Sequence, residues 1–173
     1  MADVDRLFRT YNAQLVRYLT RRLGDSDLAE EVAQETFVRA MRQEDITNER
    51  AWLFAVATNL LRDTARRQER DRKHLTLLAA ESRESSEGLD AAAELSVERM
   101  RQSAVARRAL GMLGERDRSA LLMKEEGLSY PEIAEALDLS SGSVGTTLAR
   151  ARRRLVEAYE ELEGKGERND AAS

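Results

Sequence analysis

The sequence contains no cysteine, one histidine and one proline among its 173 residues. The lack of cysteine excludes disulfides, thiolate zinc sites, iron–sulfur clusters and cysteine nucleophiles. With His74 as the single histidine, no metal site can be built from several imidazoles, and only one imidazole base is available. Nine glycines and 5 % aromatic residues give few turn signals and no large aromatic core. This composition favours helices, and we expect no bound metal and no cofactor.

The sequence also lacks long apolar runs. No run approaches the roughly twenty residues that a membrane span needs. The N-terminus, MADVD, is acidic and lacks an apolar core, which is unlike a signal peptide. We therefore expect a cytoplasmic protein with no direct insertion into a membrane.

Charged residues make up 35 % of the chain, and the formal net charge is −4. This total hides two basic clusters, one at 62–73 and one at 150–154. Affinity for nucleic acid depends on local contacts with phosphates, so the two clusters count for more than the sum.

Apolar residues recur every three or four positions in the first part of the chain, as in helices with one buried face. This spacing predicts helices at Val4–Leu23, at Ser26–Gln43 with Ser26 as N-cap, and from Glu49 to about Arg72 with Asn48 as its cap. The predicted core positions are Leu7, Phe8, Tyr11, Leu15, Leu19, Leu23, Leu28, Val32, Phe37, Met41, Trp52, Leu53, Val56 and Leu60. Trp52 could also serve as a stacking platform for a base, although a core position is the stronger interpretation.

Residues 74–103 are highly charged, and 81–88 contain no apolar stripe, which predicts a flexible linker. Periodicity returns near Val105, and residues 164–173 are expected to be a disordered tail. The predicted fold is all-α, with two small helical domains at 1–73 and 104–163.

Residues 129–155 have the pattern of a helix-turn-helix. Ser129 and Glu132 form a capping box that opens a short helix, Tyr130–Leu137. A tight turn follows, and the next helix is expected to begin at Ser140 or Ser141. Its outer face starts with small residues and continues with arginines, which suits entry into a major groove. A helical hairpin with a solvated basic face is the alternative.

Two patterns in the first domain are weak indicators of function when each is taken alone. The outer face of residues 29–40 is acidic, which is typical of a solvated helix. Asn59 and Asp63 lie one turn apart, and Arg66 and Arg67 follow. These residues alone also fit an i,i+4 pair and a basic helix C-terminus.

Three stretches together resemble the extracytoplasmic-function sigma factors, the smallest class of bacterial RNA polymerase specificity subunits. They are DLAEEVAQETFVRAM, RAWLFAVATNLLRDTARR and LGERDRSALLMKEEGLSYPEIAEALDLSSGSVGTTLARARRRL. In order and separation they are similar to the family's regions 2.2, 2.3–2.4 and 4.1–4.2, and the resemblance covers roughly residues 5–73 and 105–160. It implies an alternative sigma factor without catalysis of its own, which binds core polymerase and directs promoter-specific initiation.

The resemblance also implies a role for each matching position in the first domain. The surface for the clamp helices of the large polymerase subunit is implied to be Glu31, Gln34, Glu35 and Arg39. Loop 43–48 matches the specificity loop that takes up a base flipped from the −10 element. The residues implied to hold the melted −10 strand are Asn48, Asn59, Asp63, Arg66 and Arg67.

In the second domain, the resemblance implies that the −35 element is read as duplex. The matching positions are Ser143, Gly145, Thr146, Thr147, Ala149, Arg150, Arg153 and Arg154. Family members often carry Lys or Arg at the place of Gly145 and a larger side chain at Ala149. Readout here should therefore depend on Arg150, the threonines, backbone amides and DNA shape.

The resemblance further implies contact of the second domain with the polymerase flap and silencing by a cognate anti-sigma factor, which can hold the protein at the membrane. The linker would thread the RNA-exit path, although a plain tether explains its composition equally well. Three other hypotheses remain: a stand-alone, dimeric helix-turn-helix regulator, a helical adaptor, and an enzyme resting on His74.

Overall fold

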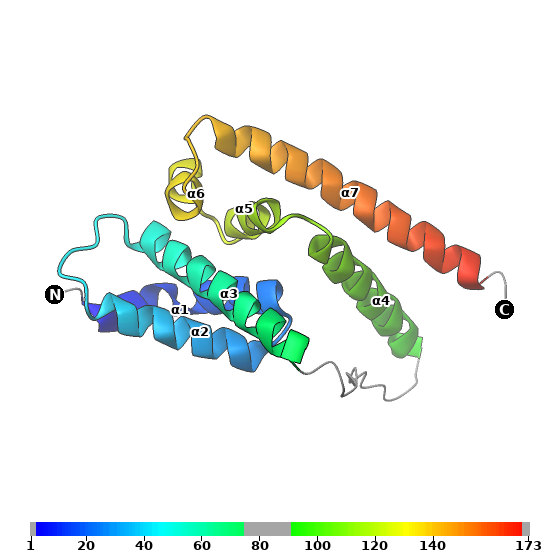
Figure 1. The fold of residues 1–173 in the computed structure, drawn as a ribbon. Helices are drawn as coiled ribbons and strands as arrows, with labels where there is room; N and C mark the ends of the chain where they lie inside the picture. The colour runs from blue at the N-terminus through cyan, green and yellow to red at the C-terminus, as the bar shows by residue number, and fades with distance from the viewer. Residues whose placement is uncertain (1–2, 75–90, 171–173) are drawn as a thin grey trace.

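The computed structural model describes residues 3–74 and 91–170, and every regular element in these ranges is an α-helix. The first domain consists of α1 (Val4–Leu23), α2 (Ser26–Ala40) and α3 (Glu49–His74). As Figure 1 shows, α1 and α2 lie together and α3 crosses them. The predicted all-α fold is thus confirmed.

The boundaries of α1 and α2 follow from local caps. The Asp3 carboxylate accepts the backbone N–H of Arg6 at 3.0 Å and opens α1. Gly24 ends α1 in the left-handed region with φ +70°, as its lack of a side chain allows. The N-cap of α2 is Asp25, whose carboxylate accepts the N–H of Leu28 at 3.0 Å. The prediction of Ser26 as this cap was therefore wrong by one residue, because a carboxylate of similar capping strength precedes the serine.

Aliphatic and aromatic side chains from all three helices fill the core of the first domain. Tyr18 is fully buried, packs against Phe54 with the rings tilted by 49° and their centroids 5.1 Å apart, and shares a 2.8 Å hydrogen bond with the Thr58 hydroxyl. Two predicted core residues lie at the edge instead: Phe8 is 45 % exposed and Met41 is 49 % exposed. Trp52 is partly buried and packs against the core, in agreement with the interpretation preferred above.

The second domain consists of α4 (Ala91–Gly111), α5 (Glu115–Glu125), α6 (Tyr130–Leu137) and α7 (Ser143–Asp170). Helix α4 begins inside the predicted linker 74–103, since 91–93 are alanines with the highest helix propensity. Helix α7 likewise runs through 164–170, where a disordered tail was expected. The remaining linker residues, 75–90, and the last three residues, 171–173, lie outside the described part of the chain.

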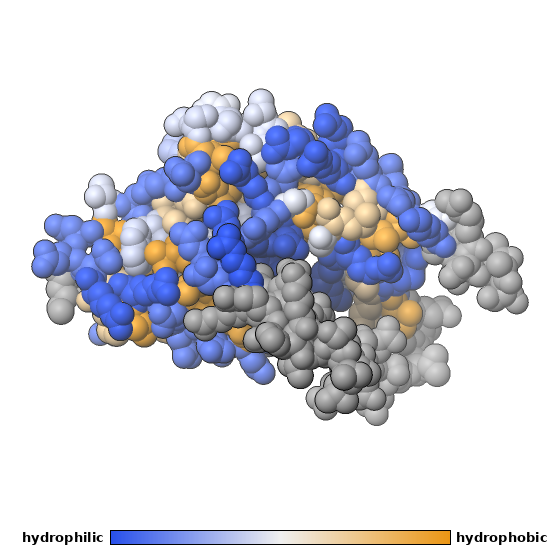
Figure 2. All heavy atoms as spheres, in the orientation of Figure 1, coloured by the Kyte–Doolittle hydropathy of each residue, from blue (hydrophilic) through white to orange (hydrophobic). Residues whose placement is uncertain are grey.

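The core of the second domain gathers where α5, α6 and α7 meet. Met123, Leu128, Ile133, Val144 and Leu148 are fully buried there. Helix α4 packs against α7, and in Figure 2 orange hydrophobic side chains show between these two helices, while hydrophilic side chains cover most of the face in view. None of the described helices is long and apolar enough to cross a membrane.

The two domains are in contact. Helix α3 packs against α6, and α1 packs against α5. These contacts place the helix-turn-helix beside the first turn of α3, as Figure 1 shows. The position of the second domain thus depends on side chains that reach from α1 and α3.

Candidate nucleic-acid and polymerase interfaces

The helix-turn-helix forms as the sequence predicts. The Ser129 hydroxyl accepts the N–H of Glu132, and the Glu132 carboxylate accepts the N–H of Ser129 at 2.7 Å, which completes the capping box. Asp138 ends α6 in the left-handed region with φ 52°. Helix α7 then begins at Ser143, two residues later than expected from Ser141, because the turn extends to Gly142.

The outer face of α7 carries most of the residues predicted to read the −35 element. Thr146, Ala149 and Arg153 are exposed, and Ser143 and Gly145 are half-buried. A Cβ on Gly145 would meet the Tyr130 ring at 3.8 Å, an ordinary contact, so space alone does not require glycine there. Thr147 lies differently from the prediction: it is 4 % exposed and faces the core, because it lies three residues after buried Val144 and four before buried Ala151, on the same helix face.

The two arginines that follow on α7 are held by a carboxylate that the sequence reasoning missed. Asp117, on α5, accepts Arg150 Nε at 3.1 Å and Arg154 Nη1 at 3.3 Å. The Asp117 side chain is 4 % exposed, and hydrogen bonding by Arg150 lowers the pKa of its carboxyl. Arg150 is 41 % exposed, so one side of its guanidinium faces the carboxylate and part of it stays open to solvent. A base contact by Arg150 therefore competes with Asp117.

The predicted −10 residues of α3 occupy its exposed side. Asn59, Asp63 and Arg66 are exposed, and the Asn59 side-chain oxygen accepts Arg62 Nη1 at 3.4 Å. The side chain of Arg67 lies outside the described residues. Asn59, Asp63 and Arg66 follow one another at helical spacing; Asp63 lies toward α2, whereas Arg66 lies toward α5 and α7.

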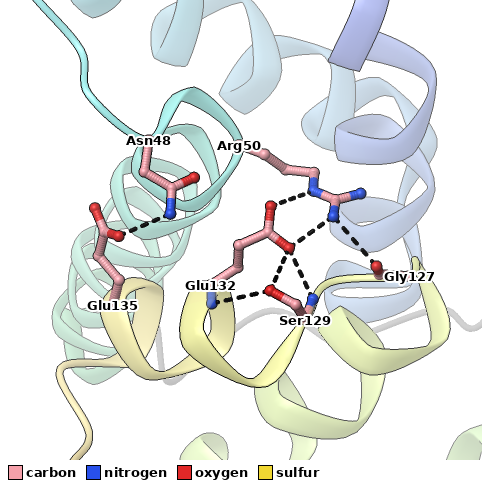
Figure 3. A network of polar contacts seen from close by, with 6 residues as sticks. All are labelled: Asn48, Arg50, Gly127, Ser129, Glu132 and Glu135. Carbon is pink, nitrogen blue, oxygen red and sulfur yellow. Dashed lines mark hydrogen bonds and ion pairs between the residues drawn. The ribbon is translucent and has the colours of Figure 1, made fainter. Parts of the chain in front are cut away.

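Asn48 has a different environment from the other predicted −10 residues. Its backbone carbonyl accepts the N–H of Trp52 at 2.9 Å, as expected at the start of α3. Its side-chain N–H donates to Glu135 on α6 at 2.9 Å (Figure 3). The side chain thus lies at the contact between the two domains.

The predicted polymerase-binding residues line one face of α2. Glu31, Gln34 and Glu35 are exposed, and Arg39 donates to Glu35 at 3.0 Å. Beside them, a groove of about 560 Å³ runs between α2 and α3 and includes Asp63 among its lining residues. The surface is acidic with an apolar floor, which suits a basic helical partner.

Figure 3 shows a polar network that joins the domains at the N-terminus of α6. Arg50 on α3 donates to Glu132 through Nε at 2.8 Å and through Nη2 at 2.6 Å, and a further bond reaches the Gly127 carbonyl at 3.3 Å. Hydrogen bonding by Arg50, helped by Ser129, lowers the pKa of Glu132 to about 2. Sequence reasoning assigned Glu132 to the capping box and missed its interdomain partner.

Further ion pairs join the domains on the side of α5. Glu126, 4 % exposed, accepts Arg17 Nη2 at 2.8 Å and lies 3.7 Å from Arg21 Nη1. Glu115 lies 3.5 Å from Arg22 Nη2 and accepts Arg62 Nε at 3.2 Å. These pairs have separations of about fifty to more than one hundred residues, so no local pattern could have indicated them. Among the described residues, no group of three potential metal ligands lies together.

The structure thus joins a capped helix-turn-helix to a three-helix domain with an acidic face, an arrangement that suits a two-domain DNA-binding protein. Residues 7–71 match the family Sigma-70 region 2, and residues 103–155 match Sigma-70, region 4. The chain belongs to the extracytoplasmic-function sigma factors of the sigma-70 family, a class of transcription regulators and not of catalytic enzymes.

Relatives of similar length support this assignment. The chain is 31 % identical over 158 residues to RNA polymerase sigma factor YlaC of Bacillus subtilis, a match that covers 88 % of this chain and 90 % of that protein. It is 30 % identical over 149 residues to the ferric citrate uptake sigma factor FecI of Escherichia coli, with 84 % of each chain covered. These matches span both domains.

Two solved structures share the fold. The sigma factor RpoE of Bartonella quintana, solved in complex with the anti-sigma factor NepR, superposes with a TM-score of 0.66 at 22 % identity and covers 92 % of this chain and 98 % of that one. CnrH, solved in complex with the cytosolic domain of CnrY, superposes with a TM-score of 0.61 at 25 % identity and covers 91 % and 88 %.

Proposed function

We propose that this sigma factor binds core RNA polymerase through α2, reads the −35 element as duplex through α7, and holds the melted −10 strand along α3. The observation that supports this most directly is the exposed face of α7, which follows a helix, α6, with a fully formed capping box. Small residues at the start of α7 let the helix approach base edges, and arginines further along reach phosphates.

On α7, the reading set is smaller than the sequence suggested. Thr146 and Ala149 present a hydroxyl and a methyl group at the exposed surface, and Arg153 provides a phosphate contact. Thr147 is buried and is therefore not among the residues proposed to read the −35 element. Because Asp117 binds Arg150 and Arg154, these two residues act in the proposal mainly on phosphates, where a partly shared guanidinium is sufficient.

Recognition of the −10 element divides between α3 and the loop before it. Asn59 and Arg66 are exposed and can hold an unpaired base edge and a backbone phosphate. The bond to Glu135 uses one N–H of the Asn48 amide and holds the side chain at the contact between the domains, while the second N–H and Oδ1 are not used by that bond. In the proposal, separation of the two domains releases the Asn48 side chain for capture of a flipped base.

The partners follow from surface chemistry. Glu31, Gln34 and Glu35 are proposed to bind the clamp helices, and the second domain is proposed to bind the flap. Val97, Met100, Met112 and Val156 are large hydrophobic residues that are more than half exposed on α4, α7 and the segment after α4. They offer a surface for an anti-sigma partner, of the kind bound to RpoE in the solved structure. We place the protein in the cytoplasm, where polymerase and DNA are.

In vitro transcription with purified chain and core polymerase on a promoter library tests the proposal. Discrete start sites preceded by two spaced elements are the expected result. Thr146→Val should change the −35 sequence preference, and Asn59→Ala should slow promoter opening, measured by permanganate reactivity of the bubble, without loss of core binding. Arg9→Gln, an exposed α1 residue far from α7 in sequence, serves as the control.

The alternatives make different predictions. Absence of start sites, together with failure to comigrate with core polymerase in gel filtration, would overturn the proposal. A stand-alone regulator would instead bind duplex DNA as a dimer and need no polymerase. A helical adaptor would bind core polymerase through α2 without showing any promoter preference.

A further inference from the structure

A basic cleft of about 840 Å³ lies between the two domains. Its walls come from the C-terminus of α1, the middle of α3, the start of α5 and the exposed arginines of α7. Seven arginines line it against the two carboxylates of Glu115 and Asp117, which leaves a formal charge of +5. Such a concentration of one charge in a concave site attracts anions.

The two carboxylates are already engaged by arginines of the cleft. Asp117 binds Arg150 and Arg154, and Glu115 is shared by Arg22 and Arg62. The excess positive charge therefore has no internal counterpart among the carboxylates that line the cleft. Solvent, protein groups outside this lining or a bound anion must balance it.

Two of the arginines have a buried Nε donor without a hydrogen-bond partner among the described residues. The Arg22 side chain is 4 % exposed, and its Nε is buried without a hydrogen-bond partner in the described part of the chain. Arg118 Nε is likewise buried without a hydrogen-bond partner among the described residues. Burial, and then the nearby charge of Arg22, lower the pKa of Arg118. Unpaired buried donors of this kind are costly, so an acceptor that reaches them is stabilised by the charge-assisted bond it forms.

The first turn of α5 adds backbone donors to the same cleft. Gly114 is the N-cap, and no side chain caps the helix there. The N–H groups of the first helical turn and the positive end of the helix dipole lie at residues 115–117, which line the cleft, whereas the N–H of Arg118 already donates to the Gly114 carbonyl. Helix N-terminus, buried arginine donors and excess positive charge thus coincide at one place.

We propose that this cleft binds a compact polyphosphate anion, a chain of two or three phosphates, either free or carried by a nucleoside. The volume falls in the range of small-molecule sites. No aromatic side chain is among the residues that line it, so the lining recognises the phosphates rather than a base. Because both domains form the walls, the anion holds them together, and it competes with DNA for Arg66, Arg150 and Arg154. This inference does not depend on the proposed function, since it needs neither polymerase nor promoter.

Isothermal titration of the full chain with tripolyphosphate, GTP and sulfate at 150 mM salt tests the site. We expect one tripolyphosphate per chain and much weaker binding of sulfate. Arg116→Gln removes an exposed cleft arginine without disturbing the core, and should weaken binding about tenfold, the effect of losing a charge-assisted contact. Arg9→Gln removes the same charge from an exposed position outside the cleft and should leave binding unchanged.

Arg118→Gln, checked for folding by circular dichroism, should weaken binding at least as much as Arg116→Gln. If GTP binds as tightly as tripolyphosphate, the phosphate chain alone is recognised; if it binds more tightly, the nucleoside contributes as well. Equal loss of affinity in the cleft variants and in Arg9→Gln would overturn the proposal, because binding would then be diffuse attraction to a basic surface. Absence of measurable heat with both polyphosphates would overturn it as well.

Discussion

The contact between Arg50 and Glu132 allows a quantitative prediction for Glu132→Gln. Glutamine keeps a hydrogen-bonding side chain at the third position of α6, so the capping box survives in part, whereas the charge is lost. The carboxyl pKa falls from 4.5 to about 2 in the folded protein, first of all through Arg50. The side chains of Arg50 and Glu132 are 24 % and 16 % exposed, so solvent screens the pair only partly.

The sign and size of the stability change follow from the linkage between protonation and folding. A carboxyl with a lowered pKa in the folded state stabilises that state above its unfolded pKa, and this contribution disappears as the pH falls toward the folded pKa. The shift corresponds to ~3 kcal/mol at pH 7 and ~1 kcal/mol at pH 3. Glu132→Gln should therefore destabilise the protein by about that amount at neutral pH, and the difference from the parent chain should vanish near pH 2.

Urea unfolding followed by circular dichroism between pH 7 and pH 3 measures this difference. Arg50→Gln should lose a similar amount, and the double variant little more, with a coupling of about 1–3 kcal/mol. Glu30→Gln, on the exposed face of α2, is the control for removing one negative charge. Parallel pH profiles for the parent and Glu132→Gln, or fully additive losses, would refute the reasoning and the interdomain contact together.

Three further substitutions test other parts of the structure. Asp117→Asn should cost about 1–3 kcal/mol in urea unfolding, because it weakens the hold on Arg150, with the deficit shrinking as the pH falls below the usual aspartate range. Tyr18→Phe should cost about 1 kcal/mol, since the Thr58 hydroxyl keeps only its bond to the backbone; an unchanged melting temperature would contradict that hydrogen bond. Gly24→Ala should cost about 1 kcal/mol through strain at φ +70°, as nothing lies within 4 Å to clash; a stabilised variant would contradict it.

The sequence predicted those features that depend on local signals. The bounds of α1 and α6 and the capping box at Ser129 agree with the structure, because each rests on residues within one or two turns. The start of α4 was missed since the charged stretch before it outweighed the alanines at 91–93. The cap of α2 moved by one residue because two capping side chains are adjacent, Asp25 and Ser26.

Side-chain partners distant in sequence could not be predicted. Asp117 has no local feature that indicates its hold on Arg150, thirty-three residues away. The bond from Asn48 to Glu135 spans eighty-seven residues and exists only because the domains touch. The candidate faces of α2 and α7 could be predicted from periodicity, but which of their residues are already engaged follows only from the folded arrangement.

The Glu132 carboxylate receives donors from two sources, and this has a mechanical consequence. One oxygen accepts the N–H and hydroxyl of Ser129 from its own domain, while Arg50 approaches from the other domain. If Arg50 withdraws, the first turn of α6 keeps its cap, and water can take the place of the guanidinium. The ion pair can therefore break and form again while α6 stays folded. Separation of the two domains at this contact does not require either domain to unfold.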